Sequence, residues 1–173
     1  MNTPVVMEHE MDDPSQSDQA PSTDLTIRPL EGSDAESVTE LLASQPTDYL
    51  RFFYAFSSDP DALRATLQAK RRDVYAGVFW RKRLICVFTL RGWDEGYDVP
   101  AFGLVVAADQ RGNAVVTGAL EVAKVIARLS GSSRMMCKVH PENKAATTAA
   151  LRLGFVGGAE EPRTGNIIYH IDL

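Results

Sequence analysis

A chain of 173 residues is long enough to bury a proper core as one domain, and 45% apolar with 24% charged residues is ordinary for a soluble globular protein. Residues 1–24 hold six acids and no Lys or Arg, which leaves 17 of the 23 acids against 18 bases in the remainder. This nearly neutral remainder gives no charge argument for nucleic acid, and the lack of an apolar run of about 18 residues excludes a membrane span.

The N-terminal segment, residues 1–24, is rich in Pro, Ser, Gln and acids. It cannot bury enough apolar surface to offset its ordering entropy, so we expect a disordered acidic tail followed by a single domain over residues 25–173. It also lacks the basic start and the apolar centre of a signal peptide. The expected location is therefore the cytoplasm.

Two cysteines, Cys86 and Cys137, lie in apolar runs with strand character. Two are too few for a disulfide scaffold or a zinc site, so we interpret both as buried free thiols in a reducing compartment. Neither is expected to act as a nucleophile, and no metal site is predicted.

The first ordered part is predicted to be one strand followed by three helices. The strand covers residues 25–28, and Ser33 with Glu36 has the spacing of a capping box at the start of the first helix. The aromatic-dense residues 49–56 are predicted to form a second short helix whose rings pack mainly in the core. The third helix begins at Pro60, because proline is tolerated in a first turn.

Three strands are predicted next, over residues 73–80, 84–90 and 101–107. The first two are joined by Arg81-Lys82-Arg83, which indicates a hairpin with a basic tip. A loop over residues 91–99 leads into the third strand. We expect these three strands to be antiparallel to one another.

The third of these strands feeds Arg111-Gly112-Asn113 and then at once a helix with apolar residues at helical spacing. Backbone N–H groups at a helix start lack intrahelical partners and lie at the positive end of the helix dipole, so such a unit attracts phosphate. A plain surface turn is the alternative interpretation. Residues 135–139 then form a strand that a right-handed crossover places parallel to the strand before the turn.

The C-terminal part is predicted to contain one more helix, over residues 143–153, which Gly154 ends in a left-handed cap. Residues 155–156 and 166–173 supply the final strands. The element order therefore predicts an α/β fold in which helices cover both faces of a mixed, mostly antiparallel sheet.

Two blocks of this sequence resemble the GCN5-related N-acetyltransferases, the GNAT family. The first block, residues 106–116, lies in register with the family's Arg/Gln-x-x-Gly-x-Gly/Ala turn between strand and helix. The second block is Asn143-Lys144-Ala145-Ala146, followed at the family's spacing by Gly154-Phe155. With this order of elements, the resemblance covers residues 25–173.

The resemblance implies a GNAT-like fold whose two parallel strands splay apart into a slot for acetyl-CoA. It implies that the pantetheine arm pairs with the first of these strands, that the pyrophosphate lies on the turn amides, and that a strand amide near Val106 stabilises the oxyanion. Asn143 also suits a helix N-cap. The resemblance assigns cofactor binding to Leu104, Val105, Val106, Arg111, Gly112, Asn113, Ala114, Val116, Thr117 and Asn143.

Three positions depart from the family pattern. Ala114 replaces the first turn glycine, which mainly removes access to positive φ. Val116 replaces a small residue, so its β-branched side chain either crowds the phosphate or faces the core. Ala150 occupies the place of the usual catalytic tyrosine, four residues before Gly154, and leaves no side chain there to protonate a thiolate.

Substitutes for the missing tyrosine come from the ends of two strands. Asp98 precedes the strand before the turn and His140 follows the strand beside the slot, and these two are our predicted catalytic residues. For each candidate a structural role is the competing interpretation, as a solvated or capping acid, a histidine that supports a turn, or a tyrosine in the sheet. The other candidates are Asp94, Glu95, Tyr97 and Tyr169.

The sequence thus predicts an N-acetyltransferase that moves an acetyl group from acetyl-CoA directly to a primary amine. In the resembled fold, the early helices and the Trp93 loop line the acceptor pocket. A small-molecule amine is favoured over a protein, because the folded part has no strong charged patch for docking a tail. We predict no nucleic-acid or membrane partner and leave a homodimer open.

Two other classes compete with this prediction. A GNAT-like domain that has lost catalysis and serves as a binding or assembly module is favoured by Ala114, Val116 and Ala150. The third class, a redox or hydrolytic enzyme, lacks support because the sequence contains no nucleophile motif and no dinucleotide fingerprint.

Overall fold

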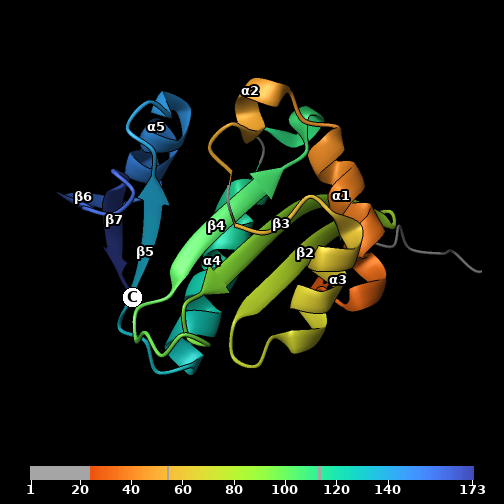
Figure 1. The fold of residues 1–173 in the computed structure, drawn as a ribbon, viewed down its shortest axis with the longest axis horizontal. Coiled ribbons are helices and arrows are strands. Elements are labelled where there is room, and N and C mark those ends of the chain that lie inside the picture. Colours follow the sequence, from red (N-terminus) through yellow and green to blue (C-terminus); the bar gives the residue numbers. More distant parts are fainter. Residues whose placement is uncertain (1–23, 54, 113) are drawn as a thin grey trace, which may run out of the picture.

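The computed structural model describes residues 24–53, 55–112 and 114–173, which form one sheet with helices on both faces (Figure 1). The predicted tail lies, apart from Asp24, outside these residues, and within them no helix is long and apolar enough to cross a membrane. The strands are β1 (Leu25–Pro29), β2 (Val74–Trp80), β3 (Arg83–Arg91), β4 (Ala101–Val106), β5 (Arg134–Val139), β6 (Val156–Glu160) and β7 (Ile167–Asp172). The helices are α1 (Ala35–Ala43), α2 (Thr47–Leu50), α3 (Pro60–Ala69), α4 (Val115–Leu129) and α5 (Lys144–Arg152), with 3-10 turns η1 (Gly32–Asp34) and η2 (Ala108–Gln110).

The strands of the sheet follow the order β1-β2-β3-β4-β5-β7-β6, and every neighbouring pair is antiparallel except β4 and β5. The predicted mixed, mostly antiparallel sheet is therefore confirmed. The predicted hairpin is also confirmed, since Trp80 pairs with Arg83 across a two-residue turn. Arg81 and Lys82 in this turn have φ angles of 47° and 67°, the left-handed values that tight hairpin turns require.

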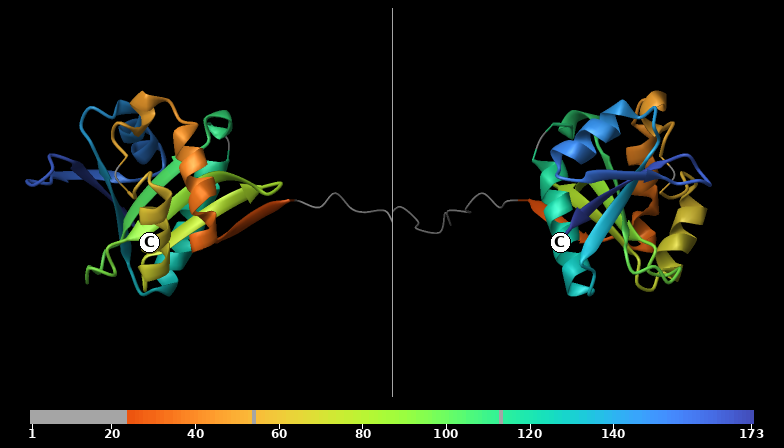
Figure 2. Two further views of the ribbon diagram at one scale, coloured as in Figure 1. Left: turned by 45° about the vertical axis from the view of Figure 1, so that its right-hand side comes forward. Right: turned by 90° about the vertical axis from the view of Figure 1, so that its left-hand side faces the viewer.

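Helices cover both faces of the sheet (Figure 2), and an apolar cluster lies between the sheet and the helices on each face. On the face covered by α1 and α3, called here the α1 face, Val38 and Leu63 are buried against the sheet. On the face covered by α4 and α5, called the α4 face, Leu120 and Ala123 pack with Phe88 of β3. Each large buried side chain contributes about 1.5–3 kcal/mol, so these clusters fix which side of every strand faces which helix.

The start of the first helix differs from the sequence prediction. The capping box joins Glu31 and Asp34 on η1, where the Glu31 N–H donates to Asp34 Oδ2 at 2.9 Å. The predicted pairing of Ser33 with Glu36 is wrong. Asp34 takes this place because Arg28 of β1 also donates to its carboxylate, so one side chain joins the strand to the helix start.

Helix α2 is shorter than predicted and ends at Leu50. The aromatic residues that follow it have separate neighbours rather than one shared helix face. Phe52 stacks on His140, and Phe56 packs edge-on against Tyr75 of β2. The chain has to leave the helical path to place these rings on different parts of the molecule.

The C-terminal part is close to the prediction, with two differences. Asn143 is the N-cap of α5, its Oδ1 accepting from the Ala146 N–H at 3.0 Å, and Gly154 has the left-handed φ of 89°. Strand β6 extends to Glu160, further than the apolar pattern indicated, because its backbone pairs with β7. Cys137 is a free thiol but only half-buried, whereas Cys86 is fully buried.

Candidate active site

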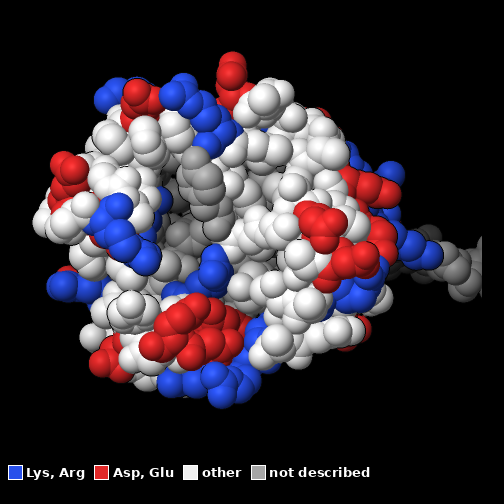
Figure 3. Space-filling view, viewed as in Figure 1, with Lys and Arg blue, Asp and Glu red and all other residues white. Residues whose placement is uncertain are grey.

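The parallel strands β4 and β5 meet at one point and then separate. Ala101 pairs with Met136, and the Met136 N–H donates to the Pro100 carbonyl at 3.0 Å. No further pairing joins these two strands among the described residues. They diverge toward their carboxyl ends (Figure 1), and the surface is hollowed between them in the same view (Figure 3). We call this opening the slot; the predicted splayed strand pair is confirmed.

Alternate residues of β4 turn their backbone groups toward the slot. The Ala107 N–H donates to the Ile85 carbonyl of β3 at 2.8 Å, which fixes the phase of the antiparallel ladder. Because hydrogen-bonded and non-hydrogen-bonded positions alternate, Val105 directs its N–H and C=O to β3, whereas Leu104 and Val106 direct theirs to the slot. Of the three strand residues predicted to bind cofactor, Leu104 and Val106 are thus placed for it and Val105 is not.

The turn after β4 leads into an uncapped helix start. Gly112 has φ of 80°, which a glycine adopts without strain, and Ala114 is the N-cap of α4 without a side-chain hydrogen bond. No acid lies in the first turn of α4. Among the described residues, no side chain caps the early N–H groups, which lie at the carboxyl end of β4, where the sequence predicts an anion site. Asn113 lies outside the described residues.

Val116 and Thr117 lie on different sides of the first turn of α4. Val116 is half-buried and packs against the apolar cluster of the α4 face, whereas Thr117 is exposed. Of the two orientations left open by the sequence, the structure has the one in which Val116 faces the core. Its β-branched side chain therefore does not stand on the exposed helix start.

Replacing Val116 with alanine is expected to lower stability by about 1 kcal/mol, since two half-buried methyl groups are lost. The affinity for CoA should change less than about threefold, because the side chain faces away from the unpaired amides. Thermal unfolding and calorimetry with CoA measure the two effects. Tenfold tighter CoA binding in this variant would instead mean that Val116 crowds the phosphate site.

The Arg111 side chain points away from the helix start. Its guanidinium carbon lies 3.9 Å from the centre of the Tyr49 ring of α2, and its Nη2 donates to Gln45 Oε1. Gln45 is itself buried and donates to the Leu41 carbonyl of α1 at 2.9 Å. Arg111 therefore fixes the turn to the helices of the α1 face.

Residues 47–57, of which Tyr54 is not described, cross the open end of the slot; we call them the strap. One end contacts the turn after β4 through Tyr49, and the middle contacts the loop after β5 (Figure 1). There Phe52 stacks on His140 with 4.6 Å between ring centres, and Arg51 pairs with Glu142 at 2.8 Å. The strap thus bridges the two strand ends that the slot separates.

The two predicted catalytic residues lie at opposite ends of the slot. The Asp98 carbonyl accepts from Ser132 Oγ at 2.9 Å, which places Asp98 beside the start of β5. His140 follows the end of β5, about 25 Å away at the rise of an extended chain. The structure therefore does not bring them together, and only His140 lies at the open end.

The ring of His140 is held in one tautomer. Its Nδ1 accepts from the Glu142 N–H at 3.2 Å, so the proton of the neutral ring is on Nε2. In this state Nε2 carries the proton and is a hydrogen-bond donor. His140 is therefore suited to donate a proton or hydrogen bond rather than to act as a base.

The other candidates named from the sequence have structural surroundings. Asp94 accepts from the Arg71 and Arg72 N–H groups at 2.9 and 2.7 Å, and these bonds lower the pKa of Asp94. Tyr97 is 64% exposed, and Tyr169 is buried in the sheet. Ala150, at the place of the usual tyrosine, is 6% exposed within the α4-face cluster.

The thiols are unsuited to nucleophilic chemistry. Burial raises the pKa of Cys86 and of Cys137 to about 12, so neither is a thiolate at neutral pH. No group of three or more His, Cys, Asp or Glu side chains that could hold a metal ion occurs in the part of the chain that the structure describes.

A family model, the acetyltransferase (GNAT) domain, matches residues 24–156. The chain therefore belongs to the GNAT acetyltransferases, whose members use acetyl-CoA as co-substrate. No curated protein sequence matches the chain as a relative.

Solved structures with this fold are similar over most of the chain. The GNAT domain of S. lividans PAT has a TM-score of 0.71 and 19% identity, covering 85% of this chain and 89% of its own. The PaiA N-acetyltransferase from Thermoplasma acidophilum, in complex with coenzyme A, has a TM-score of 0.70 and 15% identity, and the match covers 86% of this chain and 99% of that protein. The ribosomal-protein-S5-alanine acetyltransferase from Vibrio fischeri has a TM-score of 0.68 and 14% identity, and the match covers 86% of this chain and 93% of that protein. At these identities the likenesses establish the fold.

Proposed function

We propose that this chain is an N-acetyltransferase that moves an acetyl group from acetyl-CoA to a primary amine of a small molecule by direct transfer. One observation carries the proposal. The split between β4 and β5 opens at the same end of the sheet as the uncapped start of α4. A ligand with amides on one part and a pyrophosphate on another matches these two features together, as CoA does.

In this proposal, the chain supplies backbone groups for most of the cofactor. Leu104 and Val106 pair with the pantetheine amides, and the N–H groups from Ala114 to Thr117 hold the pyrophosphate. Asn143 keeps its N-cap bond through Oδ1 and offers its side-chain NH₂ to the arm. Val105 and the Arg111 side chain have no direct part.

The chemical step needs few protein groups. The amine nitrogen bonds to the acetyl carbon, the carbon–sulfur bond breaks, and the sulfur gains a proton as the nitrogen loses one. A slot-facing N–H of β4 stabilises the oxyanion, which is the largest contribution expected of the protein. His140 donates a hydrogen bond from Nε2 to the leaving sulfur, and the proton that the amine releases reaches the sulfur through water. Asp98, at the closed end, takes no part.

Two features support a small amine as the acceptor. The strap is fixed at both strand ends, which leaves restricted room for a folded protein at the open end. The loop between β3 and β4 contains Asp94 and Glu95, and Figure 3 shows an acidic patch beside the hollow. A negative surface at this place attracts a protonated amine.

The second candidate function is a GNAT-like module that binds CoA or a partner without catalysis. Ala150 is the observation in its favour, because no hydroxyl stands at the place of the usual tyrosine. The enzyme must bind acetyl-CoA and turn it over, whereas the module lacks turnover whether or not it binds CoA.

Calorimetry with acetyl-CoA, followed by thiol release with a panel of small amines, tests the proposal. We expect micromolar binding and amine-dependent release of CoA, with acetylated amine as product. No binding at millimolar acetyl-CoA would end the enzyme proposal. Binding without turnover on any amine or protein N-terminus would favour the non-catalytic module.

A further inference from the structure

Arg91, the last residue of β3, carries an unsatisfied hydrogen-bond donor. Its Nη1 donates to the Ala55 carbonyl of the strap, whereas its Nε is buried and has no hydrogen-bond partner in the described chain. Nearly all buried N–H groups in proteins are paired, and an unpaired one on a charged group is destabilising. This residue therefore calls for an explanation other than packing.

No carboxylate of the described chain neutralises Arg91. The register of β2 and β3 places Asp73 opposite it, but Asp73 Oδ1 accepts from the N–H groups of Gly92, Trp93 and Asp94 at 2.9, 2.9 and 3.1 Å. The Asp94 carboxylate is bound by the backbone of residues 71–72. Since no ion pair of Arg91 is seen among the described residues, its positive charge is left without a matched partner.

The guanidinium lies on the α1 face of the sheet, beside the strap. Arg91 pairs with Ala101, and its side chain is on the same face of the sheet as Thr89 and Gly103. A Cβ built on Gly103 would lie 3.6 Å from Ala55 Cβ, and Ala55 is the residue that Arg91 contacts. The charge therefore lies between the strap and the part of β4 that precedes the slot-facing Leu104.

Two charges of opposite sign thus lie beside the hollow. Arg91 is a cation that presents a planar fork of N–H groups, which matches the two oxygens of a carboxylate. The acidic patch that Figure 3 shows beside the hollow is suited to attract an ammonium group. A molecule with a carboxylate and an ammonium group can pair with Arg91 and with the acidic surface, whereas a simple amine leaves Arg91 unpaired.

We infer that the acceptor is a small amine that also carries a carboxylate, of the amino-acid class, and that Arg91 binds this carboxylate. The inference rests on the proposed acetyl transfer to small amines and names the substrate class of that site. The bound carboxylate holds the molecule so that its amine faces the slot-facing backbone of β4. Arg91 is in this role a substrate-binding residue that determines specificity.

The test compares free amino acids with their carboxamides, which keep the amine and remove the negative charge. We expect the wild type to favour the carboxylate at least about tenfold in kcat/KM, or about 1.4 kcal/mol. Arg91→Gln should lose this preference, so that its kcat/KM values for a carboxylate and for the matching amide lie within about twofold of each other. Arg91→Lys keeps the charge without the fork and should keep part of the preference. Arg64→Gln is the matched control, because Arg64 of α3 is neutralised by Glu36 of α1 and by Asp61 of α3.

Calorimetry of the CoA-loaded protein with the same compounds tests recognition without turnover. Binding of the carboxylates over the amides, lost in Arg91→Gln, supports the inference whether or not acetylation follows. Turnover of both series at equal rates by the wild type overturns it and leaves the proposed function intact. CoA binding with no turnover of either series overturns the proposed function. CoA affinity and melting temperature of each variant show whether the fold has been kept.

Discussion

Replacing Gly112 with leucine is expected to weaken CoA binding about 100-fold, equivalent to about 2.7 kcal/mol. Gly112 has φ of 80°, a region in which a side chain costs about 1–2 kcal/mol, so the turn would shift away from the conformation that aims its amides. Apart from the two neighbours of Gly112 in the chain, no atom of the described residues lies within 4 Å of a Cβ built there, so the new side chain would project into the space in front of the helix start. Calorimetry with CoA measures the loss.

Gly131 provides the matched control for this variant. It has φ of 87° and likewise no atom within 4 Å of a built Cβ, but it follows the opposite end of α4. Gly131→Leu should therefore lose a similar amount of stability and keep wild-type CoA affinity. If both variants lose CoA affinity equally, the loss is caused by strain in the fold. If both keep wild-type CoA affinity, the phosphate binds at a place other than the turn with Gly112.

The sequence was most informative where one local signal decided the structure. The apolar runs of β2 to β5 and the helical spacing of α4 needed no long-range information. The failures are places where distant contacts decided. Arg28 on β1 made Asp34 rather than Ser33 the capping residue, and the paired backbone of β7 recruited the glycines of β6 into a strand.

The candidate site divides in the same way. The backbone features were predictable, since a strand, a turn with Gly112 and a helix follow one another directly in the chain. The catalytic residues were not, because the register that joins Ala101 to Met136 decides which end of the slot is open. That single pairing separates Asp98 from His140. Arg91 gave no signal in the sequence, since an unpaired Nε is visible only when the neighbours of the side chain are known.

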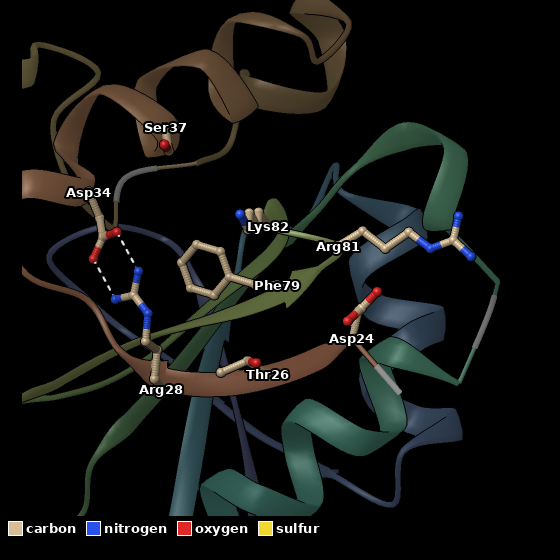
Figure 4. A pocket seen from close by; sticks show the side chains of 8 residues that line it. All are labelled: Asp24, Thr26, Arg28, Asp34, Ser37, Phe79, Arg81 and Lys82. Atoms are coloured by element: carbon tan, nitrogen blue, oxygen red, sulfur yellow. Dashed lines mark hydrogen bonds and ion pairs between the residues drawn. The ribbon is translucent and has the colours of Figure 1, made fainter. Parts of the chain in front are cut away.

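Among substitutions outside the apolar core, removal of the Asp34 carboxylate is expected to cause the largest loss of stability. Arg28 donates to both Asp34 oxygens at 2.7 Å, and the two residues line an open pocket of about 510 Å³ beside the hairpin tip (Figure 4). The Asp34 side chain is only 10% exposed, and the Arg28 guanidinium also lies 4.2 Å from the centre of the Phe79 ring. Asp34→Asn should lose about 2 kcal/mol, or about 4–8 °C in melting temperature.

The pH dependence separates this ion pair from a loss of packing. The hydrogen bonds from Arg28 lower the pKa of Asp34, so the folded state binds its proton less readily than the unfolded chain, whose pKa is about 3.9. The stability that the carboxylate contributes is therefore complete above about pH 5 and is lost as the pH falls below about 4. Denaturant unfolding from pH 7 to pH 3 should show a constant gap between wild type and Asp34→Asn that closes at acid pH. A gap that persists unchanged at pH 3 would assign the loss to packing.

Asp109 is the control for this experiment. Arg83 holds the pKa of Asp109 at about 2, but both side chains are more than half exposed to solvent. Asp109→Asn should therefore leave stability nearly unchanged from pH 7 to pH 3.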